Sequence, residues 1–203
     1  MSGVTILLLA AGASRRMGGV DKLLQQVGGQ ALLRRQALAA LATGAPVIVA
    51  LPPHAKGRLA VLAGLPVAVI EVARASDGMG ASLATGTLAA GEPEGLMVML
   101  ADMPEIEAGD IATLITAFKA ANGQQVIRAA AADGSPGHPV IFPADCLPTL
   151  CALTGDTGAR AVLRANVHRT VLVPLPGQRA TTDLDTPEAW AEWRAANPHG
   201  KET

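Results

Sequence analysis

Three positively charged residues near the N-terminus have the types and the spacing to hold a polyphosphate. They are Arg15, Arg16 and Lys22, and they follow a continuous apolar run over residues 5–11. Glycines 12, 18 and 19 are interleaved with them. Because glycine lets the backbone approach a ligand closely and turn its N–H groups toward it, this segment predicts a cationic loop delivered by a buried strand. The alternative is an ordinary surface turn.

Two familiar phosphate-binding patterns do not fit these glycine-rich segments. The P-loop needs a lysine directly after its last glycine and then a serine or threonine, whereas Lys22 lies between Asp21 and Leu23. The dinucleotide fingerprint begins at Gly78-Met79-Gly80, but Leu83 stands where its third glycine belongs. Neither motif is present in this chain.

A second glycine-rich loop over residues 75–83 opens into a predicted helix that runs to about residue 90. Ser82 and the backbone amides at the helix start could bind an anion, or the glycines could let a flat base lie on the main chain. The alternative is a plain helix entry with Ser76 or Asp77 as its N-cap.

Asp102 follows a predicted buried strand over residues 96–100 and precedes Pro104. Open α/β sheets bind their ligands at the carboxyl ends of central parallel strands, and the proline prevents this strand from continuing. Since Mg²⁺ prefers hard oxygen ligands, Asp102 is the leading candidate for a metal ligand. The alternative is a cap for the helix predicted near residues 108–121.

Two further carboxylates, Asp183 and Asp185, alternate in the segment after residue 180, which is interpreted as a strand end ahead of the closing helix. Thr186 is a good N-cap for the closing helix, with Pro187 in its first turn. A cap does not account for two aspartates spaced to emerge on one side of an extended segment. The pair therefore indicates a second source of metal ligands.

His138 lies between Gly137 and Pro139 in a loop predicted over residues 132–139. Side chains in such a turn face solvent or ligand more often than core, which favours contact with a substrate. A structural histidine is the alternative, and metal ligation lacks a partner histidine nearby.

The elements that must position these residues alternate between strands and helices. Strands are expected at 5–11, 45–51, 67–72, 96–100, 125–131, 140–142 and 168–173. Helices are expected at 31–43, 57–63, about 83–90 and 110–121, from 155 onward, and from 187 onward. This order predicts a three-layer α/β/α sandwich, with a Rossmann-like, mostly parallel sheet between helices. The length of 203 residues predicts one domain over 1–203.

Composition narrows the class of protein. Two Phe, two Trp and no Tyr require an aliphatic core, and a formal net charge of −1 gives no field for binding nucleic acid. Cys146 and Cys151 lack metal-ligand spacing and are expected to be reduced side chains. The apolar run at 5–11 is too short for a membrane span and lacks a signal peptide's basic start, so a cytoplasmic protein is expected.

Four separated motifs resemble those of the molybdenum cofactor nucleotidyltransferases, and most closely the cytidylyltransferase branch, the MocA-like branch of the MobA-like NTP transferases. They are residues 9–18 with Lys22, residues 100–104 (Leu-Ala-Asp-Met-Pro), residues 137–140 (Gly-His-Pro-Val) and residues 183–188 (Asp-Leu-Asp-Thr-Pro-Glu). Residues 78–83 and 155–160 match the same branch in order and spacing. The resemblance covers nearly the whole chain and implies a fold of the nucleotidyltransferase type.

The resemblance also implies an activity, the transfer of CMP from CTP to the terminal phosphate of molybdopterin with release of pyrophosphate. The preference for CTP rests on Ala10-Ala11-Gly12, where the guanylyl branch has paired glycines. The segment Gly19-Val20-Asp21-Lys22 is more guanylyl-like. Because that end of the loop meets phosphates that every nucleotide shares, we weight the base-lining residues more and expect CTP rather than GTP.

By matching position, the resemblance implies a role for each site residue. Nucleotide contacts would come from Ala10, Ala11, Gly12, Arg15, Arg16, Lys22, Gly78, Gly80, Ser82 and Asp102. The catalytic groups would be Lys22, Arg16 and Asp102. The ligands of Mg²⁺ would be Asp102 and Asp185, with Asp183 as a neighbouring candidate. Acceptor contacts would come from Gly137, His138 and Arg160.

Two alternative functions remain open on the sequence. One is a related nucleotidyltransferase that uses GTP, or that acts on a sugar phosphate or another phosphorylated small molecule. The other is a non-catalytic nucleotide-binding carrier of the cofactor. The expected partners are CTP and the molybdopterin-type cofactor, with transient contact to a molybdoenzyme or its chaperone, and neither nucleic acid nor membrane.

Overall fold

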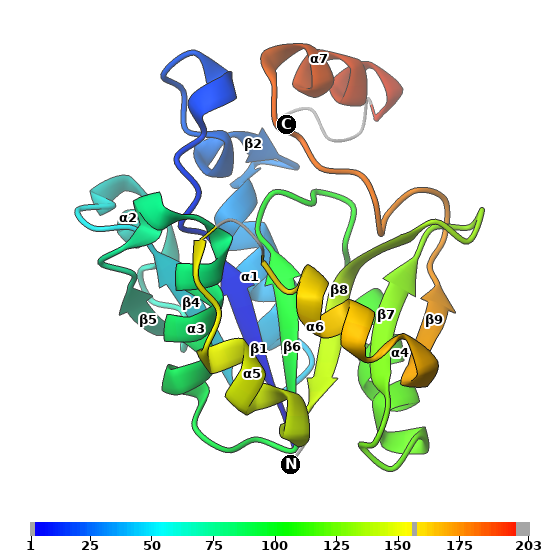
Figure 1. Cartoon of the computed structure of the whole chain (residues 1–203). Helices are drawn as coiled ribbons and strands as arrows, with labels where there is room; N and C mark the ends of the chain where they lie inside the picture. The colour runs from blue at the N-terminus through cyan, green and yellow to red at the C-terminus, as the bar shows by residue number, and fades with distance from the viewer. Residues whose placement is uncertain (1–2, 156–157, 198–203) are drawn as a thin grey trace.

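The computed structural model describes residues 3–155 and 158–197. A seven-stranded sheet in the order β5-β4-β1-β6-β8-β7-β9 forms the centre of the fold, beside a small hairpin of β2 and β3 (Figure 1). The strands are β1 (Val4–Leu9), β2 (Gln26–Val27), β3 (Gln30–Ala31), β4 (Val47–Leu51), β5 (Ala68–Glu71), β6 (Gly95–Leu100), β7 (Val126–Ala130), β8 (Pro136–Pro143) and β9 (Thr170–Pro174). Strand β8 pairs antiparallel with β6 and β7, and the other pairs of the sheet are parallel. The mostly parallel sheet predicted from the sequence is confirmed.

Helices cover both faces of the sheet. Figure 1 shows α3 (Met79–Ala90), α5 (Leu147–Cys151) and α6 (Arg160–Ala165) on one face. The other face carries α1 (Leu32–Leu41), α2 (Lys56–Leu62) and α4 (Ala108–Ala120). Helix α7 (Pro187–Ala196) lies over the edge at which the parallel strands end (Figure 1). The predicted three-layer arrangement is therefore confirmed.

Strand β1 shows why the sequence folds this way. All six of its residues are buried, as expected of a central parallel strand with helices on both faces. Ile6 and Leu8 belong to one apolar cluster and Leu7 to the other, because successive side chains of a strand point to opposite faces. The strand thus contributes side chains to the apolar clusters on both faces of the sheet. It ends at Leu9, and the cationic loop follows.

Helix α7 carries the start signals that the sequence suggested, and α4 begins with Glu107 rather than Asp102 as its N-cap. The Thr186 hydroxyl accepts a hydrogen bond from the Ala189 N–H, and Pro187 occupies the first turn of α7. Glu107 and Asp110 form a reciprocal capping box at the start of α4. None of the helices in the described residues is both long and apolar enough to cross a membrane.

Several local predictions were wrong. Strand β8 begins at Pro136, so His138 lies in a strand rather than in a loop. Residues 168–169 belong to a 3-10 helix that precedes β9. The hairpin of β2 and β3 and the short helix α5 were not expected. Helix α6 begins at Arg160, and residues 156 and 157, which belong to the start of the helix predicted from 155 onward, lie outside the described residues.

Candidate active site

The cationic loop (residues 10–22) leaves the carboxyl end of β1. Its middle turns through a short 3-10 helix over Arg15–Met17, flanked by left-handed backbone at Ser14 and Gly18, with φ of 49° and 60°. Met17 is buried, so it fixes the loop against the core while Arg15 and Arg16 remain exposed. The glycine at 18 is needed because a side chain rarely adopts that backbone conformation.

Lys22 ends this loop and is held between two carboxylates. Its Nζ lies 2.5 Å from Oδ2 of Asp102 and also pairs with Oδ1 of Asp185. The other oxygen of Asp185 pairs with Arg16. The Lys22 side chain is only 11 % exposed, so its own two ion pairs are largely shielded from solvent, whereas Arg16 is exposed. Residues 80 and 163 positions away from Lys22 in the chain therefore meet at one ammonium group.

The two carboxylate segments reach this point by different routes. Asp102 follows β6 directly, as the sequence predicted, at the same edge of the sheet as the cationic loop. Asp183 and Asp185 lie in an irregular connection between β9 and α7, not at a strand end. Leu184 between them is buried and donates its N–H to the Asp102 carbonyl oxygen at 3.2 Å. That bond sets the connection beside Asp102.

Charge and burial set the protonation of the cluster. Burial alone would lower the pKa of Lys22, but the charges and hydrogen bonds of Asp102 and Asp185 outweigh it and raise that pKa above its ordinary value. Burial would raise the pKa of Asp185, but Lys22 and then Arg16 hold it below its ordinary value. Burial and the neighbouring charges of Asp185 and Asp102 raise the pKa of Asp183. Lys22 is therefore a fixed cation at neutral pH.

The three aspartates have the donor set of a divalent-cation site. Asp102, Asp183 and Asp185 each offer a carboxylate oxygen, and these oxygens lie within 4.8 Å of one another. Oδ1 of Asp102 is buried and has no hydrogen-bond partner among the described residues. A buried carboxylate oxygen without a donor is unfavourable unless a cation satisfies it. The residues present thus fit a hard divalent ion such as Mg²⁺.

A cleft of about 840 Å³ opens over these groups. Most of the nucleotide and metal residues implied by the resemblance line it, namely Ala10, Ala11, Gly12, Arg15, Arg16, Lys22, Gly78, Ser82, Asp102, Asp183 and Asp185. Pro52 and Pro53, which follow β4, and Arg58 from α2 also line it. The lining of the cleft combines cations and carboxylates with glycine and small apolar residues.

Four of the predicted site residues lie outside the set that lines this cleft. A Cβ atom at Gly80 would come within 2.7 Å of the Gly155 carbonyl oxygen, so close packing of α3 explains that glycine. Gly137 faces Ala180 in the same way, with a Cβ 1.8 Å from its carbonyl oxygen. Arg160 is exposed at the start of α6. The acceptor contacts of Gly137, His138 and Arg160 stay predictions.

His138 is half-buried, and its backbone N–H donates to the Ala180 carbonyl oxygen at 2.9 Å. Burial, with a contribution from the Arg128 charge, lowers the pKa of His138 to about 4, against an opposing effect of Asp102. The side chain is therefore neutral at neutral pH. A neutral imidazole can offer one donor and one acceptor to a ligand, but no charge.

Arg58 is the cleft residue that sequence reasoning missed. It is 5 % exposed, which is unusual for arginine without partners of opposite charge. A signal was present in the sequence, because Arg58 lies four residues before Leu62 and therefore on the same, buried face of the short helix α2.

Comparison with known proteins identifies the family. The model of the MobA-like NTP transferase domain matches residues 6–171. The chain belongs to that family. The residues matched run from β1 into β9 and include the cationic loop, Asp102 and His138, whereas Asp183 and Asp185 lie beyond them. As a MobA-like NTP transferase, the protein is a nucleotidyltransferase.

Individual relatives span nearly the whole chain. Nicotine blue oxidoreductase of Paenarthrobacter nicotinovorans is 29 % identical over 91 % of this chain and 93 % of its own. The crystal structure of Rv0371c from Mycobacterium tuberculosis H37Rv is 26 % identical, with a TM-score of 0.80 over 94 % of this chain and 96 % of its own, and that protein also has a structure in complex with manganese. These relatives support the MocA-like branch predicted from the sequence.

A more distant likeness concerns the fold. CMP:2-keto-3-deoxy-manno-octonic acid synthetase, in complex with CTP, is 14 % identical, with a TM-score of 0.73 over 96 % of this chain and 98 % of its own. The predicted Rossmann-like fold of the nucleotidyltransferase type is thereby confirmed.

Proposed function

We propose that this MobA-like NTP transferase moves CMP from CTP to the terminal phosphate of a molybdopterin-type cofactor and releases pyrophosphate. The observation that carries the proposal is the meeting of Lys22 and Arg16 with the aspartate cluster in one cleft of about 840 Å³. Transfer between two polyanions needs fixed cations and a metal site at one place, and this cleft supplies both.

The proposed reaction needs no strong general base, because the acceptor phosphate is already ionised. One of its oxygens attacks the α-phosphorus of CTP and forms a new P–O bond. The bond from the α-phosphorus to the oxygen that bridges to the β-phosphorus breaks, and pyrophosphate leaves with that electron pair. The task of the protein is to bring like charges into bonding distance and to hold them in line.

The residues of the cleft divide this task. Lys22 stays charged because its carboxylate partners raise its pKa, and it would neutralise the phosphates together with Arg15 and Arg16. Ser82 at the start of α3 would add a hydroxyl toward the nucleotide. Mg²⁺ bound by Asp102, Asp183 and Asp185 would supply further neutralisation of the phosphate oxygens.

The base preference is proposed to lie at residues 10–12, which line the cleft directly after β1. Ala11 is buried and Gly12 is exposed, so a methyl group at position 11 limits the space in which a base can lie on the backbone. We expect Ala11→Gly to raise the GTP:CTP ratio of kcat/KM by roughly tenfold, since small changes in a pocket carry discrimination of that order. An unchanged ratio would remove the argument for CTP.

The deciding experiment is a pyrophosphate-release assay with CTP, GTP, ATP and UTP, purified molybdenum cofactor and Mg²⁺. Release that requires CTP and the cofactor together supports the proposal. Release with a sugar phosphate supports the broader nucleotidyltransferase, and tight binding of CTP and cofactor without release supports the carrier. The name of the Paenarthrobacter relative suggests a parallel oxidoreductase assay. Turnover there without any pyrophosphate release would contradict the transfer reaction as the main activity.

A further inference from the structure

We propose that Arg58 is a positioning residue that holds the two ends of the cationic loop and thereby sets Lys22 toward the nucleotide. The inference rests on the proposed function in one respect, namely that Lys22 meets a triphosphate. Arg58 itself belongs to α2, and this helix lies outside the sequence motifs on which the resemblance rests.

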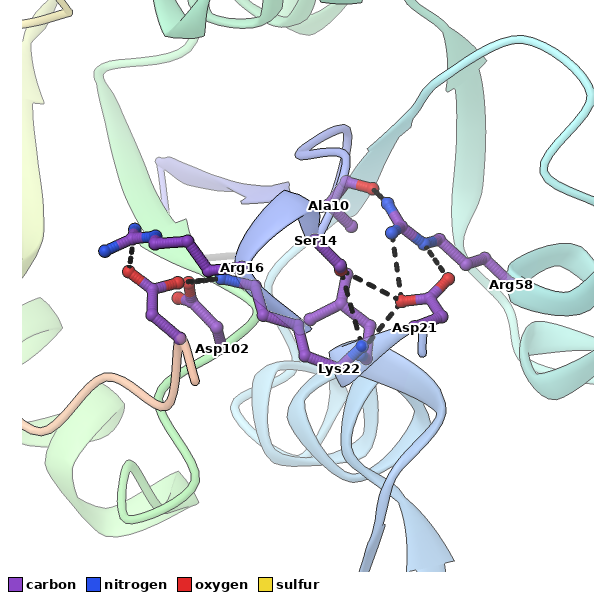
Figure 2. A network of polar contacts seen from close by, with 9 residues as sticks. Ala10, Ser14, Arg16, Asp21, Lys22, Arg58 and Asp102 are labelled. Carbon is purple, nitrogen blue, oxygen red and sulfur yellow. Dashed lines mark hydrogen bonds and ion pairs between the residues drawn. The ribbon is translucent and has the colours of Figure 1, made fainter. Parts of the chain in front are cut away.

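The contacts of Arg58 join the start of the loop to its end. Its Nη1 donates to the carbonyl oxygen of Ala10 at 2.6 Å. Its Nε and Nη2 donate to the two carboxylate oxygens of Asp21 at 2.7 and 2.9 Å (Figure 2). Ala10 is the first residue after β1, and Asp21 directly precedes Lys22. One planar, bidentate guanidinium thus spans the whole loop.

Asp21 passes this constraint to Lys22. Besides Arg58, its carboxylate accepts hydrogen bonds from the Leu23 N–H at 3.0 Å and from the Ser14 hydroxyl at 3.5 Å. The backbone N–H of Lys22 donates in turn to the Ser14 hydroxyl oxygen at 3.4 Å. With four donors on its two oxygens, Asp21 has little capacity left for a metal or another ligand. Its function is to fix the backbone on both sides of Lys22.

Helix α2 is built to place Arg58 at this point. A Cβ atom at Gly57 would come within 2.9 Å of the Leu24 side chain, so a glycine there lets α2 approach the turn that follows the loop. Arg34 of α1 donates to the carbonyl oxygens of Val61 and Ala63 at 2.9 and 3.1 Å and holds the far end of α2. Arg34 therefore anchors the helix that carries Arg58. Arg169 is the matched control, because it also pairs with a carboxylate, that of Asp145 at 2.7 Å, and donates to a main-chain carbonyl, that of Gln124 at 3.2 Å, but does not line the cleft.

Charge gives Arg58 a second effect on the same loop. Without Arg58, the Asp21 carboxylate would stand without its cationic partner next to Lys22 in the chain, where it would compete with phosphate for the Lys22 ammonium group. Three of the five guanidinium N–H donors of Arg58 are already used by protein groups. We therefore assign it to holding the loop rather than to direct contact with phosphate.

The test compares Arg58→Met with Arg169→Met in the full chain. Backbone amide exchange over residues 12–21 is measured relative to the β1 segment, and binding of Mg-CTP and Mg-GTP is measured by calorimetry. We expect Arg58→Met to accelerate exchange in the loop and to weaken nucleotide binding by roughly 10- to 100-fold, the cost of a misplaced binding group. Arg169→Met should do neither. Equal exchange in the two variants would overturn the proposal.

A double-mutant cycle separates positioning from direct contact. If Arg58 acts through Lys22, then Arg58→Met adds little to the binding loss that Lys22→Ala already causes. Fully additive losses would mean that Arg58 meets the nucleotide itself, which would contradict the positioning role.

Two milder variants keep the test decisive if Arg58→Met fails to fold. Asp21→Asn removes the charge of the partner and should reproduce the faster exchange, while Arg58→Lys should restore part of the nucleotide affinity. Normal exchange in Asp21→Asn would overturn the proposal. If the wild-type chain binds neither CTP nor GTP, the proposed function fails, and amide exchange still decides the role of Arg58.

Discussion

Lys22 has two carboxylate partners, and they act on it differently. Asp185 shares its charge with Arg16, whereas Asp102 faces Lys22 with one oxygen and leaves the other buried and unpaired. Asp102 is thus the carboxylate with spare capacity for a cation. Its main-chain carbonyl, which holds Leu184, does not depend on the side chain.

We expect Asp102→Asn to lower nucleotidyl transfer by at least roughly 100-fold while the melting temperature changes little. The amide keeps the shape of the side chain but removes the charge that a metal and Lys22 need. The measurements are pyrophosphate release and thermal denaturation. Asp145→Asn is the matched control, because Asp145 also pairs with an arginine, Arg169 at 2.7 Å, but does not line the cleft. If Asp102→Asn kept most of the pyrophosphate-release activity, the assignment of Asp102 as a metal ligand would be contradicted.

His138 gives the protein an acid-sensitive stability. Its folded-state pKa of about 4 lies below its ordinary value of 6.5, because burial and then the charge of Arg128 disfavour the protonated ring, against the opposing charge of Asp102. Between these two values the unfolded chain binds more protons than the folded chain, so stability present above pH 6.5 is lost as the pH falls toward 4.

We expect His138→Gln to reduce the pH dependence of the unfolding free energy by up to about one proton in that window. The measurement is urea denaturation at several pH values between 4 and 7. The control is His54→Gln, because His54 is exposed. An identical slope in wild type and His138→Gln would show that the ring does not titrate differently on folding.

Helix α3 and its partner loop are arranged by close backbone contact. Gly80 in the first turn of α3 faces the backbone of residues 154 and 155, which cannot move aside as a flexible side chain could. This contact, rather than a ligand, explains the second glycine of the Gly78-Met79-Gly80 segment. It also sets the start of α3, from which Ser82 reaches the cleft.

Gly80→Ala should destabilise the protein by about 1–3 kcal/mol, the usual cost of overpacking a tight contact. The measurement is the free energy of unfolding from urea titration. Gly109→Ala is the control, because a Cβ at Gly109 in α4 meets nothing within 4 Å, and a change between zero and about 1 kcal/mol of added stability is expected there. Equal effects of the two changes would contradict the contact argument.

Residues from the far end of the chain complete the candidate active site. The connection between β9 and α7 carries Asp183 and Asp185, and contacts to the loop after β6 hold it on one side, where Arg179 pairs with Glu107 at 2.9 Å. Helix α7 holds it on the other side through Trp190, which is 2 % exposed and packs in the same apolar cluster as Ile6 and Leu8. The positions of Asp183 and Asp185 in the cleft therefore depend on the packing of α7 against the core.

We expect Trp190→Ala to lower the unfolding free energy by about 3–5 kcal/mol, the range for removing a buried aromatic side chain. Pyrophosphate release should fall as well at temperatures where the protein is still folded, because Asp183 and Asp185 lose their support. Glu192→Ala on the exposed face of α7 is the control and should change neither. If Trp190→Ala lowered the stability but left pyrophosphate release unchanged, α7 would not be needed to hold Asp183 and Asp185 in place.

Much of this arrangement could be predicted from the sequence, for physical reasons that are local. A buried run such as 5–11 gives a central strand because alternate side chains must fill both cores. Glycines 18 and 19 mark positive φ, and Thr186 with Pro187 marks a helix start. The mostly parallel sheet and the end of β6 at Leu100, two residues before Asp102, follow from the same kind of signal. The assignment of 1–203 to one domain remains a prediction.

Only the tertiary structure decided which distant residues meet. No local pattern indicates that Arg58 spans Ala10 and Asp21, or that the Leu184 N–H binds the Asp102 carbonyl. His138 was misplaced for the same reason, because its short Gly-Pro context resembles a turn until pairing with β6 and β7 extends it into β8. Periodicity and backbone preference act over a few residues, whereas contacts between distant segments depend on how whole elements pack.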